Sequence, residues 1–226
     1  MHAVPFDSVN VRDSGEGERR WREAGTPIVP SLVVDGEALP ILHVSQLAAA
    51  LGLPSPEAAP GARLAADTAD LLRAWLDQVR PLPWSVLVEP TPSRGRSLRN
   101  LTVNVFHPFT LLPAAWAGDG FAWDPDEDAL REQRLEAAAG VVGYAQSIHE
   151  SWSAFLGGVD DLDRPGLVVP SPRGALDWLA LLDHQRWHAA FHYRQLIAFL
   201  DARGDSRPPV LPLDLLEGLG LPDDVF

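Results

Sequence analysis

The sequence predicts a mainly helical α+β protein, in which an antiparallel four-helix bundle follows a small, incomplete α/β domain. Residues 4–53 contain short strand-like and helix-like segments in alternation. From about residue 61 onward, apolar residues recur at helical spacing over long stretches. A Pro-rich segment without periodicity, PSPEAAPG, separates the two parts. We therefore expect domains at 1–53 and 61–226, joined by a linker at 54–60.

Four local patterns predict the N-terminal domain. VPFDSVNV at 4–11 alternates like a strand, and Ser14 can cap a short helix that Gly25 ends. IVPSLVVDGEALPIL indicates a β-hairpin around Asp35-Gly36, and HVSQLAAALGL indicates a last short helix. Because unpaired sheet edges are a liability, the strand at 4–11 must pair with the hairpin or with a neighbouring chain. We expect an incomplete sheet and favour a homodimer.

Four helices are predicted in the second domain. The first covers 62–80 and ends at Pro81 and Pro83, after which a loop extends to residue 96. Ser97 can cap a second helix over 98–117, which Pro108 and Pro113 must kink or break. The third is expected from Ala129 to Leu156, behind the acidic segment DPDED, and the fourth from Ser171-Pro172 to Ala202. Four helices of this length imply an antiparallel bundle.

Composition excludes several classes of function. The formal charge is −13, which argues against binding nucleic acid. No apolar run approaches the roughly 20 residues that cross a bilayer, and no secretory signal pattern is present, so we expect a cytoplasmic protein without membrane contact. All positive charge is arginine and there is no cysteine. Schiff-base chemistry, disulfides and a thiol nucleophile of the chain itself are therefore excluded, and sulfur chemistry must arrive on a substrate.

Three histidines are spaced four residues apart in the segment HQRWHAAFH, at His184, His188 and His192. Neighbours at this spacing share a helix face with roughly 5–6 Å between Cβ atoms, so a pair can bind one metal ion. All three cannot do so easily, because eight residues of helix rise about 12 Å. His107 is the best third ligand, since it continues a polar stripe with Asn100 and Asn104. A hydrogen-bonded core histidine remains the alternative for His107.

The segment WHAAFHYRQL resembles the last-helix signature of the DinB/YfiT-like superfamily of metal-binding four-helix bundles, in which His-x3-His is followed closely by Gln. The resemblance covers about residues 61–203, and Pro108 directly after His107 departs from it. It implies that His107, His188 and His192 bind a divalent metal ion, zinc or alternatively nickel, and that Gln195 supports them. His184 is expected to support the ligands or to be exposed, and His149 to support them or to lie in the core.

The segment GTPIVPSLVVDGEALPIL resembles the second half of a glutaredoxin, in which a Val-Pro pair carries the cis-proline before a hairpin. The first strand and the cysteine motif of that fold have no counterpart here, which excludes classical disulfide exchange. Two interpretations remain. The backbone at Val29 and Pro30 retains a weak thiol-binding role, or the domain is a structural or dimerising remnant.

The superfamily resemblance also implies a reaction class, because DinB-type proteins include mycothiol-dependent isomerases and thiol S-transferases. We expect a metal-dependent transferase or isomerase that uses mycothiol or a similar small thiol on a small electrophilic substrate. Arg94, Arg96 and Arg99, with Asn104, are the candidate substrate-binding residues, because guanidinium groups hold anions well. A solvated basic loop is the alternative for the arginines. A hydrolase with metal-activated water and a non-catalytic metal-binding bundle are the alternative functions.

Overall fold

The computed structural model describes residues 15–25, 30–54, 59–92 and 95–205, and single positions outside them at 5, 7, 9, 11, 57, 207, 211, 215, 216, 219 and 221. The described chain is mainly helical and has two short antiparallel strand pairs. It divides into two compact units, Met1–Glu57 and Ala58–Phe226, with the boundary inside the segment expected as the linker. Within the described residues, no helix combines the length and apolar character needed to cross a bilayer.

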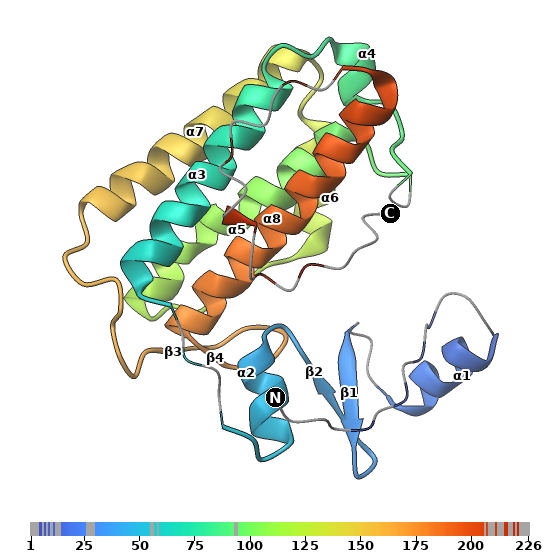
Figure 1. The fold of residues 1–226 in the computed structure, drawn as a ribbon, viewed down its shortest axis with the longest axis vertical. Helices are drawn as coiled ribbons and strands as arrows, with labels where there is room; N and C mark the ends of the chain where they lie inside the picture. Colours follow the sequence, from blue (N-terminus) through green and yellow to red (C-terminus); the bar gives the residue numbers. More distant parts are fainter. Residues whose placement is uncertain are drawn as a thin grey trace. The chain divides into compact units, whose positions relative to one another are not determined.

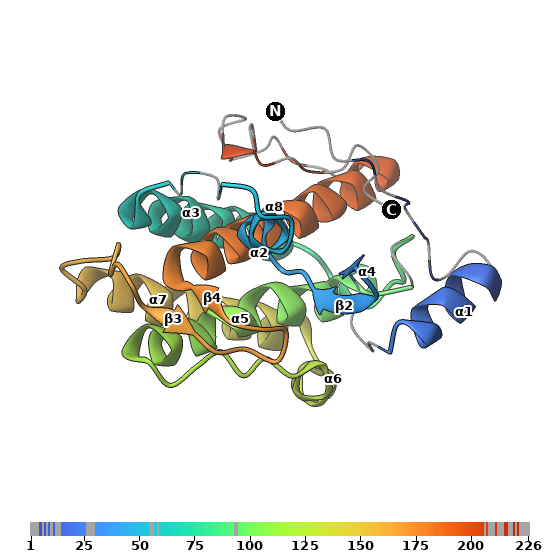
Figure 2. The same ribbon diagram turned by 90° about the horizontal axis from the view of Figure 1, so that it is seen from below.

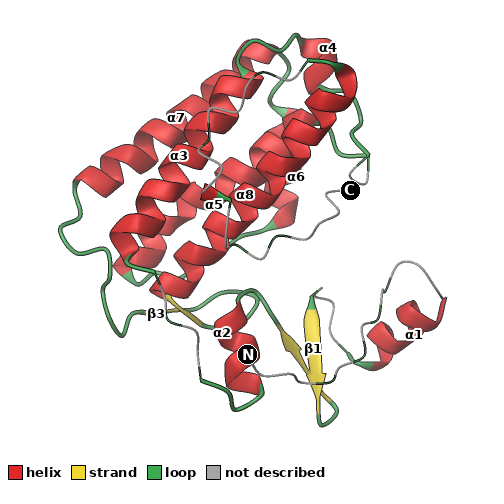
Figure 3. Cartoon of the chain, in the orientation of Figure 1, coloured by secondary structure: helices red, strands yellow, loops and turns green. Residues whose placement is uncertain are grey.

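The first unit contains a β-hairpin between short helices (Figure 3). Its elements are α1 Gly15–Glu23, β1 Ser31–Val34, β2 Glu37–Pro40 and α2 Val44–Ala50. Asp35 and Gly36 both have positive φ, 51° and 86°, as the two-residue turn of such a hairpin requires. The strand expected at 4–11 falls largely outside the described residues. Its described positions, 5, 7, 9 and 11, are not in a strand.

Four long helices of the second unit pack side by side as a bundle: α3 Gly61–Val79, α5 Leu98–Ala117, α7 Ala138–Gly157 and α8 Trp178–Arg203 (Figure 1). α3 and α5 each contact both α7 and α8. The shorter elements are α4 Trp84–Leu87, α6 Pro125–Gln133, β3 Val168–Val169 and β4 Leu176–Asp177. The first two predicted helices match α3 and α5, and the two prolines inside α5 do not end it.

The core of the bundle combines apolar packing with two buried Trp–Thr hydrogen bonds. Leucine, phenylalanine and tryptophan side chains from all four helices are fully buried. The Trp75 indole donates to Thr102 Oγ1 at 3.0 Å, and the Trp152 indole donates to Thr68 Oγ1 at 3.1 Å. Because a buried indole N–H needs an acceptor, each threonine fixes the position of the tryptophan it contacts.

The structure differs from the expected third helix, which is divided into α6 and α7. Asp124 caps α6 by accepting a hydrogen bond from the Asp126 backbone N–H at 2.9 Å. α6 packs against α5, whereas α7 packs against both α3 and α5 (Figure 2). The buried Leu135 lies in the connection between α6 and α7.

The fourth helix begins later than Ser171-Pro172, the predicted start. The chain first forms the β3–β4 hairpin, in which Val169 pairs with Leu176. α8 then starts at Trp178, where the Asp177 side chain accepts from the Ala180 N–H at 2.9 Å. The capping carboxylate therefore decides the start of this helix, rather than the Ser-Pro pair.

Candidate metal centre

The polar stripe of α5 faces two carboxylates of α6. Asn100 Nδ2 donates to Glu132 Oε2 at 2.6 Å, and Asn104 Nδ2 donates to Asp128 Oδ2 at 3.2 Å. His107 Nδ1 lies 2.5 Å from Asp128 Oδ1. Asp128 and Glu132 are four residues apart, so both lie on the same face of α6. Two matched polar rows therefore join α5 to α6.

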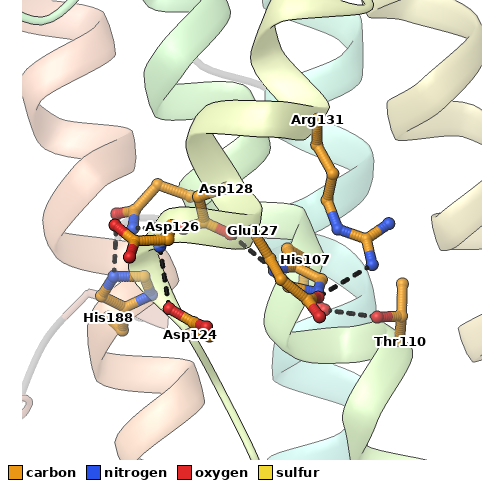
Figure 4. A network of polar contacts seen from close by, with 9 residues as sticks. His107, Thr110, Asp124, Asp126, Glu127, Asp128, Arg131 and His188 are labelled. Carbon is orange, nitrogen blue, oxygen red and sulfur yellow. Dashed lines mark hydrogen bonds and ion pairs between the residues drawn. The ribbon is translucent and has the colours of Figure 1, made fainter.

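Asp128 orients the imidazole of His107 (Figure 4). His107 is 0% exposed and Asp128 is 6% exposed. Because a carboxylate accepts hydrogen bonds, the Nδ1–H of His107 donates to it and the lone pair is left on Nε2. This Nε2 is buried and has no hydrogen-bond partner. Glu127 Oε2 lies 3.5 Å from this nitrogen.

The same carboxylate orients His188 through Asn104. Since the Asn104 amide nitrogen donates to Asp128, its Oδ1 accepts from His188 Nε2, at 3.2 Å. The lone pair of His188 is then on Nδ1, which is shielded from solvent and has no hydrogen-bond partner. In Figure 4, Asp128 lies between the imidazoles of His107 and His188. One buried carboxylate thus fixes the tautomer of both histidines.

His192 is adjacent to His188 on α8. Their ring centroids are 4.6 Å apart and the ring planes are nearly perpendicular, at 89°. His192 Nδ1 donates to Gln195 Oε1 at 2.7 Å. Each of the three histidines expected as ligands therefore has one ring nitrogen held by a protein acceptor. Histidines that bind metal ions typically have such a partner.

The electrostatic surroundings keep His188 neutral. Burial lowers the pKa of its imidazole well below the usual value, and electrostatic interactions with His192, His184, Arg96 and Arg173 lower the pKa further. A neutral imidazole is the form that binds a metal ion.

The donor chemistry of this centre fits a divalent ion, although its ligands are not gathered at one point. Within the described residues, no group of three or more His, Asp or Glu side chains is arranged to hold an ion. His188 and His192 are adjacent, while His107 is connected to them through Asp128 and Asn104. The buried, unpartnered nitrogens of His107 and His188 are the donors that a metal ion would use.

Of the two other histidines considered, only His184 lies beside this group. Its ring stacks on that of His188, with centroids 6.3 Å apart and planes at 23°. His149 lies between α7 and α3, where it is hydrogen-bonded to the Ala69 backbone. Burial and then the charge of Arg73 lower the pKa of His149.

The candidate substrate-binding arginines have different environments. Arg96 lines a cleft at the start of α5, whereas Arg99 is paired with Glu132 through contacts of 2.9 and 3.0 Å. Arg94 is outside the described residues, as is Val29 of the expected thiol-binding pair. The carbonyl of Pro30 accepts from the Ile41 N–H at 3.1 Å, which closes the hairpin of the first unit.

Sequence reasoning missed Asp128 and Glu132, the two acceptors that organise the centre. One signal in the sequence could have identified them. Asp128 and Glu132 are four residues apart, the same spacing as Asn100 and Asn104 in the polar stripe of α5. The acidic segment was instead interpreted only as favourable charge at a helix N-terminus. No family model, curated protein or solved structure matches the chain.

Proposed function

We propose that this chain is a DinB-like metal-dependent enzyme that uses mycothiol or a similar small thiol on a small electrophilic substrate, as an S-transferase or an isomerase. His188, His192 and His107 would hold one divalent ion, zinc or nickel. The observation that supports this proposal is the orientation of all three imidazoles. Gln195, Asn104 and Asp128 each accept from one ring nitrogen, and the other ring nitrogens of His107 and His188 are buried without a hydrogen-bond partner.

The nucleophile in this proposal comes from the cosubstrate, because the chain contains neither cysteine nor lysine. A divalent ion at these histidines would lower the pKa of a bound thiol. The cosubstrate sulfur would form a bond to an electrophilic carbon, and the thiol proton would leave to solvent. In a transfer, the leaving group departs with the electron pair of the broken bond. In an isomerisation, the thiol adds, the bond geometry changes, and the thiol is expelled.

The residues of the chain orient the imidazoles and shield their ring nitrogens from water. Asp128 holds His107 directly and His188 through Asn104, so hydrogen bonds within the chain fix the ring orientation of these two histidines. The shielded nitrogens of His107 and His188 lie where electrostatic interactions are stronger than in water.

A turnover assay with and without the thiol tests this function. Full-length protein loaded with zinc would be mixed with an activated aryl halide or an unsaturated dicarboxylic acid. Each substrate is tested with mycothiol, with a sulfur-free analogue of mycothiol, and with neither. We expect turnover only with mycothiol, and its loss in His107→Ala. Equal rates without thiol would indicate a hydrolase, and no turnover with any electrophile would indicate a non-catalytic bundle.

A further inference from the structure

The contact between His107 and Glu127 joins two acceptor atoms. His107 Nε2, which carries the lone pair of the ring, lies 3.5 Å from Glu127 Oε2. This distance is longer than the roughly 2.7–3.2 Å of an N–H···O hydrogen bond. The nitrogen is buried and has no hydrogen-bond partner. Two acceptor atoms this close repel each other, whereas a cation bound by both attracts each of them.

The separation of the two atoms matches that of two ligands of one metal ion. Zinc binds imidazole nitrogen and carboxylate oxygen at roughly 2.0–2.2 Å, most often in a tetrahedral arrangement. Two ligand atoms at these distances and at the tetrahedral angle are about 3.3–3.5 Å apart. The 3.5 Å between His107 Nε2 and Glu127 Oε2 falls within this range.

Asp128 holds the other nitrogen of the same ring. Its carboxylate contacts His107 Nδ1, and Figure 4 shows Asp128 and Glu127 on different sides of the imidazole. A carboxylate behind a histidine is a common partner of metal-binding imidazoles, because it fixes the tautomer and makes the free nitrogen a better donor. The Glu127 side chain is 53% exposed, so it connects the buried nitrogen to solvent and gives an ion a way in.

We propose that Glu127 is a further ligand of the ion that His107 binds, with Glu127 Oε2 and His107 Nε2 on the same ion. Arg131 Nη2 donates to the same oxygen at 3.2 Å, so this guanidinium competes with the ion. The inference rests on the proposed function, since it adds a carboxylate to the ligands of the same ion. With His188 and His192 the set would contain three imidazoles and one carboxylate, and zinc can expand to a fifth position that admits the thiol.

Competition titration of full-length, metal-free protein with zinc and a chromogenic chelator tests the inference. Glu127→Gln keeps the size of the side chain and removes its charge, so zinc affinity should fall by roughly tenfold or more. Arg131→Gln should raise zinc affinity by roughly two- to fivefold, because it removes a competing, partly exposed ion pair. Glu18→Gln is the matched control and should leave the affinity unchanged. Glu18 is also half exposed and is paired with an arginine four residues later.

Cobalt(II) in place of zinc distinguishes a ligand from a nearby charge. The visible absorption of cobalt depends on the atoms that it binds. Its bands should therefore shift in Glu127→Gln but not in Arg131→Gln, which changes only a neighbouring charge. A lower zinc affinity with an unchanged cobalt spectrum in Glu127→Gln would make Glu127 a neighbouring charge only and would overturn the inference.

The remaining outcomes separate this inference from the proposed function. Equal zinc affinity in Glu127→Gln and Glu18→Gln would overturn the inference and leave the three-histidine centre standing. If Glu127→Gln and His107→Ala weaken zinc binding but His188→Ala does not, the three-histidine centre fails and the pair of His107 and Glu127 stands. No zinc binding by the unaltered protein would overturn both.

Discussion

Replacing Asp128 by asparagine tests whether one carboxylate organises the centre. The substitution keeps the size of the side chain but removes its charge and one of its two acceptor oxygens. His107 Nδ1, at 2.5 Å, and Asn104 Nδ2, at 3.2 Å, both depend on that carboxylate. A hydrogen bond to a charged group contributes about 1.5–3 kcal/mol, and one of the two donors must lose its partner. We expect the free energy of unfolding to fall by about 2 kcal/mol.

Two measurements check this expectation. For a domain of this size, about 2 kcal/mol corresponds to a fall in Tm of roughly 4–8 °C, which thermal denaturation detects. Zinc affinity should fall by roughly 10- to 100-fold, because the imidazoles are no longer held in one tautomer. The matched control is Asp70→Asn, which removes a half-exposed carboxylate of α3. If Asp128→Asn and Asp70→Asn have the same Tm and zinc affinity, Asp128 does not orient the histidines.

Two further predictions follow from the burial of individual side chains. Burial, and then neighbouring positive charge, lowers the pKa of His188 in the folded protein, so below about pH 6.5 the unfolded chain binds the additional proton. The free energy of unfolding of metal-free protein should therefore fall as the pH drops below about 6.5, by up to about 1.4 kcal/mol per pH unit from this group. Denaturant titrations should show a shallower fall in His188→Gln than in the unaltered protein. Identical slopes of stability against pH in the two proteins would contradict the prediction. Thr102→Val leaves the Trp75 indole without its acceptor and should cost about 1–3 kcal/mol in the same measurement, whereas an unchanged midpoint would mean that the hydrogen bond adds nothing.

Local patterns in the sequence were sufficient to predict where several elements begin or turn. Ser97 accepts from the Asn100 N–H at 3.1 Å and begins α5 where the sequence predicts it. Asp35 and Gly36 form the predicted hairpin turn, since both residues tolerate positive φ. These features depend on contacts within a few residues, and the residue types alone specify them.

The division between α6 and α7 could not be predicted in this way, because no glycine or proline interrupts the segment from Arg134 to Ala137. It depends on the packing of α6 against α5, which brings Asp128 to His107 and Glu132 to Asn100. The role of Asp128 was missed for the same reason. Its partners are 21 and 24 residues away in the chain and meet it only after the helices pack.

The metal content of the purified protein tests the central claim most directly. Elemental analysis of full-length protein made without a histidine tag should find close to one divalent ion per chain. His188→Ala, His192→Ala and His107→Ala should lose that ion. His184→Ala should retain it, because His184 is one helical turn before His188 and two before His192. Full retention of the metal in both His188→Ala and His192→Ala would contradict the account.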